Sequence, residues 1–95
     1  MIEHLVFLKI RDEAGAVETI ANALVSLKGR VPAIKDISCG RNVSDRSKGF
    51  NLGLRVLLET EADIEAYRVH PEHMKILNEM IKPVMEDMIV IDYTR

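Results

Sequence analysis

The feature that most constrains the fold of this chain is the order in which its hydrophobic periodicity changes. Strand-like runs rich in β-branched and apolar residues occupy 2–10, 34–43 and 50–59, and a last one extends from Met88 to Tyr93. Between the first two runs, apolar residues recur at spacings of three and four, which predicts a helix that begins after Asp12 and ends near Gly29.

A second helical region follows the third strand and is expected to be broken. "TEAD" at 60–63 resembles a capping box with Thr60 as the N-cap. Pro71 disfavours a helical conformation at His70 but is well placed to open a new helix. We therefore expect one short helix to end near His70 and another to cover 71 to about 82.

The resulting order, β-α-β-β-α-β, predicts an α+β protein of the ferredoxin-like type. In that arrangement four strands form one antiparallel sheet, and the helices cover one of its faces. Ninety-five residues suffice for one hydrophobic core, so residues 1–95 are expected to form a single domain. Gly40 and Gly53 lie inside the central strands and indicate a bulge or a close backbone approach.

The strand residues on the side away from the helices are also apolar: Leu5, Phe7, Leu57, Ile89 and Ile91. Left uncovered, such a face would exceed the ~300–600 Å² of apolar patch that monomers usually expose. We therefore predict a homodimer in which two sheets pack face to face and form a dimeric α/β barrel.

Composition and charge exclude several other classes of function. The net charge of −2 and the pI of about 5.9 give no basis for binding nucleic acid or an anionic membrane. No apolar run reaches about 18 residues, and the N-terminal residues do not resemble a signal peptide. The single cysteine, Cys39, fits a reducing cytoplasm and is expected to be a buried thiol rather than a nucleophile.

The segment "YRVHPEHMK" at 67–75 holds most of the residues with chemical potential. As a metal site it would use His70 and His73, with His4 or Glu72 as a third ligand. Pro71 places His70 outside the helix that contains His73, so we predict neither a metal nor a cofactor here. Two other interpretations stay open, an acid/base pair and a helix junction in which the imidazole caps a helix and Tyr67 packs its ring.

The acid/base interpretation assigns His73 and Tyr67 as the catalytic residues. An imidazole with a pKa near about 6.5 suits proton abstraction, and a phenol suits hydrogen bonding to a developing oxyanion. His4 would enter the same pocket from the first strand, although a histidine on an apolar strand face is often a core residue. The expected walls of this pocket are apolar: Val6, Leu8, Leu52 and Leu54.

Four segments together resemble the stress-responsive dimeric α/β-barrel (Dabb) family: "IEHLVFLKI", "GRNVS", "YRVHPEHMK" and "PVMEDMIVIDY". The resemblance implies a dimeric ferredoxin-like barrel over nearly the whole chain. One plant member of this family is a polyketide cyclase that closes a ring by intramolecular aldol condensation without a cofactor. Its catalytic pair falls on Tyr67 and His73, and a pocket histidine falls on His4.

Two polar pocket positions of that cyclase align with Leu24 and Leu52, which implies a different substrate for this chain. Another plant relative holds a magnesium ion in the loop before the second strand, so the resemblance makes the loop Val31–Asp36, with its backbone carbonyls and Asp36, a hypothetical cation site. The resulting prediction is a protein that binds a small carbonyl-containing or aromatic ligand, with cofactor-free cyclase- or lyase-like chemistry. The alternatives are a non-catalytic stress-associated structural or binding module and, by fold analogy, a cofactor-free monooxygenase.

Overall fold

The computed structural model describes all 95 residues. It contains four strands, three α-helices and one π-helical turn, in the following order: β1 (Ile2–Ile10), α1 (Ala16–Val25), β2 (Asp36–Arg41), β3 (Leu52–Leu58), α2 (Ala62–Arg68), α3 (Pro71–Ile76), the π-helical turn η1 (Leu77–Ile81) and β4 (Met85–Thr94).

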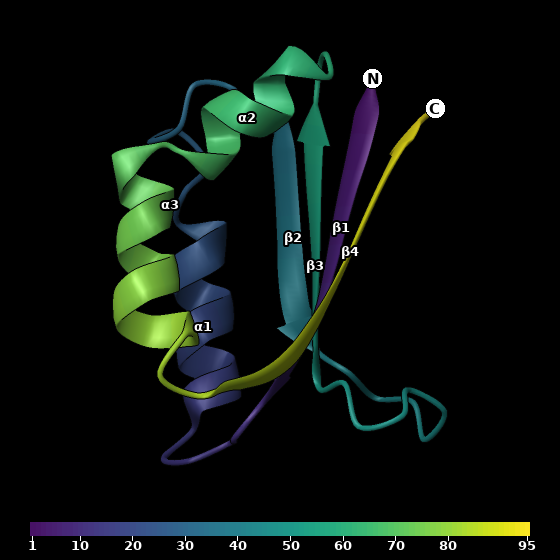
Figure 1. The fold of residues 1–95 in the computed structure, drawn as a ribbon, viewed down its shortest axis with the longest axis vertical. Helices are drawn as coiled ribbons and strands as arrows, with labels where there is room; N and C mark the ends of the chain where they lie inside the picture. Colours follow the sequence, from purple (N-terminus) through teal and green to yellow (C-terminus); the bar gives the residue numbers. More distant parts are fainter.

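The strands form one antiparallel sheet in the order β2-β3-β1-β4, and the helices lie together on one side of it (Figure 1). The predicted ferredoxin-like α+β fold is confirmed. None of the helices is both long enough and apolar enough to cross a membrane.

Strand register divides the sheet into an inner face, which the helices cover, and an outer face. Val6, for example, pairs with Leu54 on β3 and Val90 on β4, and all three lie on the inner face. The outer face consists of Glu3, Leu5, Phe7, Lys9, Ser38, Gly40, Gly53, Arg55, Leu57, Asp87, Ile89, Ile91 and Tyr93, with Asp36 at its edge. The apolar residues predicted to point away from the helices therefore do so.

The hydrophobic core lies between the helices and the inner face. It is a single cluster of 18 buried residues drawn from every strand except β4. Val17, Ile20 and Leu24 supply the contribution of α1, at the spacing expected for one helical stripe. Tyr67 is the only aromatic member of the cluster.

Helix α1 begins at Ala16, one turn of chain after Asp12, where the periodicity of the sequence changes. Ala14 and Gly15 adopt left-handed conformations, with φ of 51° and 74°, so the chain turns once before the helix starts. The Asp12 carboxylate accepts a hydrogen bond from the Val17 amide at 3.2 Å and so caps an amide in the first turn of the helix, although it lies four residues before Ala16. After Val25 the chain continues in turns toward Gly29, whose φ is 87°.

The predicted break between α2 and α3 is confirmed at His70 and Pro71. His70 is extended, with ψ of 134°, and its Nδ1 accepts a hydrogen bond from the Glu72 amide at 3.1 Å. His70 is thus the N-cap of α3. The helix does not continue as a regular α-helix to residue 82, because the Lys82 amide donates to the Leu77 carbonyl at 2.9 Å, a π-type bond.

Two further expectations need correction. β4 starts at Met85 rather than Met88, because it pairs with β1 along its entire length. Gly40 and Gly53, which were expected to mark a bulge or a close backbone approach, mark neither: they face each other in a regular β2–β3 ladder, and a Cβ at Gly40 would meet no atom within 4 Å. The irregularity of the sheet lies between Lys9 and Ile10 instead.

Candidate functional site

A cleft of about 290 Å³ lies between the helices and the inner face, on the side where the sheet ends with β4. Its walls are mainly apolar, and its polar groups converge from four elements. The lining residues are His4, Val6, Leu8, Leu24, Leu54, Ile64, Tyr67, Arg68, His73, Leu77, Ile81, Met88, Val90 and Asp92. An apolar cavity with a few convergent polar groups is the usual form of a small-molecule site, and this volume is at the small end of the range.

The cleft exists because the helices do not cover the edge strand. Met88 and Val90 on the inner face of β4 are close to half exposed, whereas Val6 on the neighbouring β1 is buried. The space between α2, α3 and β4 is therefore open to entry at the sheet edge. Leu77 and Ile81, the first and last residues of the π-helical turn, also line the cleft.

Tyr67 is the most deeply buried polar group of the cleft. Its side chain is 1% exposed, and its hydroxyl has no hydrogen-bond partner within the protein. Burial raises the pKa of this phenol far above its usual range, and the nearby Cys39 adds to the effect. The hydroxyl therefore stays protonated at neutral pH and is free to donate a hydrogen bond to a ligand.

His73 lies beside Tyr67 with its tautomer defined by the backbone. The two ring centroids are 4.4 Å apart and the rings are tilted by 41°. His73 Nδ1 lies 2.9 Å from the Arg68 carbonyl oxygen, which only accepts, so Nδ1 bears the hydrogen and Nε2 is left as the basic nitrogen. Burial lowers the pKa of this imidazole, although the Arg68 carbonyl acts in the opposite direction.

His4 completes the group from the strand side, together with a carboxylate. Its ring stands edge-on to Tyr67 with centroids 5.5 Å apart, and its Nδ1 donates to Asp92 Oδ1 at 2.5 Å. A carboxylate on Nδ1 fixes the ring orientation and leaves Nε2 available to a ligand. Both residues lie on the inner face because His4 pairs with Asp92 in the β1–β4 ladder.

The structure brings together most of the residues that the sequence placed in one pocket. Tyr67, His73 and His4 face the cleft, and so do the expected wall residues Val6, Leu8 and Leu54 and the pocket position Leu24, which the resemblance implied. Leu52 does not line it: this side chain is fully buried opposite Leu8, farther along the sheet. Asp92 and Arg68 were not predicted, and the guanidinium of Arg68 is paired with Glu65 at the surface.

The arrangement differs from a metal centre. His70 turns its Nδ1 to the α3 amides while His73 faces Tyr67, so the two imidazoles have separate roles. No group of three or more His, Cys, Asp or Glu side chains lies close enough together to hold a metal ion. In the hypothetical cation loop, the Asp36 carboxylate already pairs with Lys28 and Arg55, each at 3.3 Å.

Cys39 lies on the inner side of β2, packed partly against the core. Burial raises the pKa of its thiol to about 11. The thiolate is the nucleophilic form, so this cysteine is not activated at neutral pH. The reactive groups of the cleft are thus two imidazoles, one carboxylate and one phenol.

Comparison with known proteins shows relatives of the same size and fold. Olivetolic acid cyclase from Cannabis sativa is 29% identical over 97 residues, which is 98% of this chain and 95% of the cyclase. A dimeric ferredoxin-like protein of unknown function from Thermobifida fusca has a TM-score of 0.83 at 23% identity, over 99% of this chain and 90% of that one. Hydroxynitrile lyase from Passiflora edulis has a TM-score of 0.82 at 20% identity, over 97% and 90% of the two chains.

The model of the stress responsive A/B barrel domain, Dabb, matches residues 2–95. This match covers the four strands, the helices and all the residues of the cleft. The chain belongs to the Dabb family.

Proposed function

We propose that the cleft binds a small carbonyl-containing or aromatic ligand and performs acid/base chemistry without a cofactor. The observation that supports this most is the buried Tyr67 hydroxyl, which has no protein partner and lies beside an imidazole with a free Nε2. A buried hydroxyl without a hydrogen bond costs about 1–3 kcal/mol, so the site is better satisfied with a ligand acceptor bound.

In the proposed reaction His73 Nε2 takes a proton from a carbon next to a carbonyl group. Negative charge then develops on the carbonyl oxygen, which accepts a hydrogen bond from the Tyr67 hydroxyl. The enolate carbon forms a bond to a second carbonyl carbon, and the protonated His73 returns its proton to the new alkoxide. The reverse sequence cleaves a carbon–carbon bond, so the same groups serve cyclase-like or lyase-like chemistry.

The lowered pKa of His73 matches its role as the base. A neutral imidazole is available at pH 7 because burial disfavours the charged form. Tyr67 matches the role of the donor, because its raised pKa keeps the proton on oxygen. Asp92 has no direct contact with the reacting atoms in this scheme and positions His4.

Leu24 lines the cleft where the resemblance to the plant cyclase implies a polar residue. The ligand is therefore expected to be more apolar at that end than the substrate of a cyclase with a polar group there. The half-buried, unactivated thiol of Cys39 also agrees with a protein of the reducing cytoplasm.

The test uses hydrogen exchange, which does not require the natural substrate. Acetophenone is small enough for a cleft of about 290 Å³, and its methyl protons exchange with deuterated water when a base removes them. We expect the protein to accelerate this exchange, and His73→Ala to remove about 10²–10⁴-fold of the acceleration. The matched control is His70→Asn, which alters a histidine three positions away and keeps a helix-capping side chain.

The outcomes separate the two functions that the sequence left open. Exchange that is equally fast with His73→Ala contradicts the catalytic proposal. Ligand binding by the cleft without any exchange supports the non-catalytic binding module instead. Absence of both binding and exchange, over a panel of small aromatic and keto acids, contradicts both.

We also propose that the protein is a homodimer formed through the outer faces of its sheets. Phe7, Ile89, Ile91 and Tyr93 are 37–49% exposed and lie side by side on that face. Related structures of the same fold are described as dimeric, including the Thermobifida fusca protein. A light-scattering mass near 10.7 kDa at micromolar concentration contradicts this proposal.

A further inference from the structure

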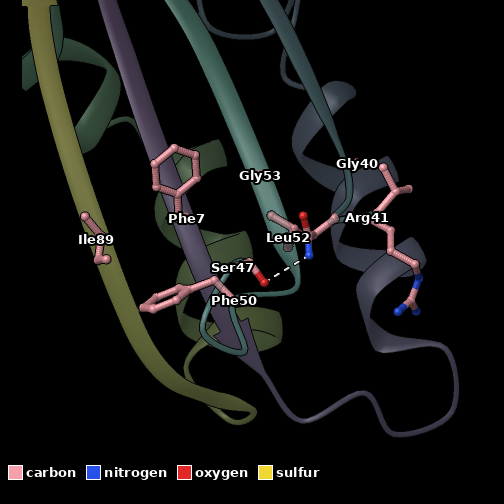
Figure 2. A pocket seen from close by; sticks show the side chains of 10 residues that line it. Phe7, Gly40, Arg41, Ser47, Phe50, Leu52, Gly53 and Ile89 are labelled. Atoms are coloured by element: carbon pink, nitrogen blue, oxygen red, sulfur yellow. Dashed lines mark hydrogen bonds between the residues drawn. The ribbon is translucent and has the colours of Figure 1, made fainter. Parts of the chain in front are cut away.

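The largest hollow of the protomer offers no free charge to a ligand. It measures about 590 Å³ and lies on the outer face, where Phe7, Ile89 and Phe50 stand around it (Figure 2). Arg41, the one charged residue on its border, is held by two carboxylates of its own subunit. The hollow also belongs to the face that the proposed homodimer covers. Recognition of a charged small ligand therefore points to the cleft on the inner face.

The cleft is bordered by one permanent cation. Arg68 is the only lysine or arginine among the residues that line it. A guanidinium stays charged at physiological pH, and its planar set of donors can bind both oxygens of a carboxylate at once. The only carboxylate of the lining, Asp92, is occupied by its hydrogen bond with His4. The charge that the cleft offers to a ligand is therefore positive.

Arg68 lies at the end of the cleft that holds the reactive groups. It directly follows Tyr67 in α2, and its carbonyl oxygen accepts the hydrogen bond from His73 Nδ1 at 2.9 Å. The donor and the base of the proposed reaction are thus next to the backbone of Arg68 or bonded to it. A group recognised by the Arg68 side chain would consequently be close to the carbonyl group that reacts.

The opposite end of the cleft is apolar. Strand register places Leu8 opposite Met88, four residues along the strands from the pair formed by His4 and Asp92. At about 3.3 Å per strand residue, the two ends are about 13 Å apart. A ligand that fills the cleft would thus have its carbonyl group and its negative charge at one end, and its apolar part at the other.

The present partner of the Arg68 guanidinium holds it only weakly. Glu65, three positions earlier in the chain, accepts two hydrogen bonds from it at 2.6 and 3.0 Å. The two side chains are 60% and 64% exposed, so water and salt screen their attraction, and exposed pairs of this kind contribute little to stability. The guanidinium can therefore exchange Glu65 for the carboxylate of a ligand at little cost.

We propose that the cleft takes a keto acid and that Arg68 binds its carboxylate in place of Glu65. This inference rests on the function proposed above and adds the charge of the ligand to it. The carboxylate lies close to the reacting carbonyl group, and the rest of the molecule is apolar. Arg68 contacts a part of the ligand that does not react, so it determines which ligands bind and does not take part in proton transfer.

The test compares two ligands of nearly the same shape and different charge. 3-Acetylbenzoate is an anion, 3-acetylbenzamide is its neutral analogue, and both contain the methyl ketone of acetophenone. We expect the wild type to bind the benzoate about tenfold or more tighter than the amide, in calorimetric titrations at one ionic strength. Arg68→Met should lower this preference by about fivefold or more. Arg68→Lys, which keeps the charge but loses the fork of donors, should lower it less.

Two further variants exclude a general effect of charge or of structure. Arg46→Met removes the same charge from the loop between β2 and β3, at the opposite end of the sheet from α2 (Figure 1), and should keep the preference. Glu65→Gln removes the competing carboxylate and should tighten binding of the benzoate by about threefold. All the substituted side chains are exposed, so the variants should stay folded by circular dichroism.

The outcomes distinguish this inference from the function on which it rests. Equal affinity of the wild type for both ligands, or a preference that Arg68→Met leaves intact, overturns the role of Arg68 while binding by the cleft stands. A preference that depends on Arg68, without exchange of the methyl protons, supports the keto acid and contradicts only the catalytic step. Absence of binding to both ligands overturns the keto-acid inference, and the wider panel of small aromatic and keto acids then decides the proposed function separately.

Discussion

Removing only the hydroxyl of Tyr67 separates a ligand-binding role from a structural one. Tyr67→Phe keeps the buried ring and its contacts with His4 and His73. The hydroxyl that it removes has no hydrogen-bond partner within the protein. The substitution therefore deletes a polar atom from an apolar site without leaving any other group unpaired.

The expected sign of the stability change follows from this geometry. Burying a hydroxyl without a hydrogen bond costs about 1–3 kcal/mol, so Tyr67→Phe should leave the free energy of unfolding unchanged or raise it by up to about 2 kcal/mol. If the hydroxyl instead held the helix junction together, its loss would lower this free energy by about 1 kcal/mol or more. Urea unfolding of the wild type and the variant at equal concentration measures the difference.

The same variant should lose most of its acid/base chemistry. Removal of one donor to a developing oxyanion costs about 10²–10³-fold in rate in well-studied sites, so exchange of acetophenone methyl protons should slow by at least tenfold. Tyr93→Phe is the matched control, because the second tyrosine of the chain lies half exposed on the outer face. A destabilised Tyr67→Phe variant with normal exchange would refute the assignment of Tyr67 to the ligand.

Three further predictions concern the other groups of the cleft and the outer face. Because burial lowers the pKa of His73, the unfolded chain takes up a proton at this imidazole at a higher pH than the folded protein does. The stability that the neutral His73 contributes is therefore complete above about pH 6.5 and is lost as the pH falls through the lower pKa of the folded state. The hydrogen exchange catalysed by His73 should likewise persist below about pH 6.5 before it declines. A pH profile of exchange with its midpoint at or above 6.5 contradicts this. Asp92→Ala should lower the ligand affinity and should lower the free energy of unfolding by about 1 kcal/mol. Asp92→Asn keeps an acceptor for His4 Nδ1, so it should lower the free energy of unfolding, measured in urea, by less. Equal decreases in the two variants would show that this hydrogen bond is unimportant. Phe7→Asp should convert the dimer to monomers in light scattering, because it places a carboxylate in the centre of the outer face; a dimeric variant would place the interface elsewhere.

The fold was predictable because its determinants are local or periodic. The spacing of apolar residues along the chain predicted the order of strands and helices, and Pro71 by itself predicted the position of the break between α2 and α3. The start of α1 was less predictable, since it depends on Ala14 adopting a left-handed conformation that few residues other than glycine favour. The π-helical turn after Ile76 depends on packing and has no simple pattern in the sequence.

The site was only partly predictable because it depends on contacts between distant residues. His4 and Asp92 are 88 positions apart, and nothing near either one indicates the other. One signal was available: the predicted topology places the first and last strands side by side, and aligning their apolar alternation would have put Asp92 opposite His4. Leu52 was misplaced for a related reason, because a shared strand face does not define how far along that face a cleft extends.

The edge strand β4 connects the two surfaces of the protein. Its inner side contributes Asp92, Val90 and Met88 to the cleft, and its outer side contributes Ile89 and Ile91 to the proposed interface. Within the protomer both sides of β4 are largely exposed, so its position depends mainly on its hydrogen bonds to β1. An edge strand held in this way is among the less stable parts of a fold. Packing Ile89 against a partner subunit would restrain β4 and with it the Asp92 carboxylate that orients His4. The dimer interface is therefore expected to contribute to the order of the cleft.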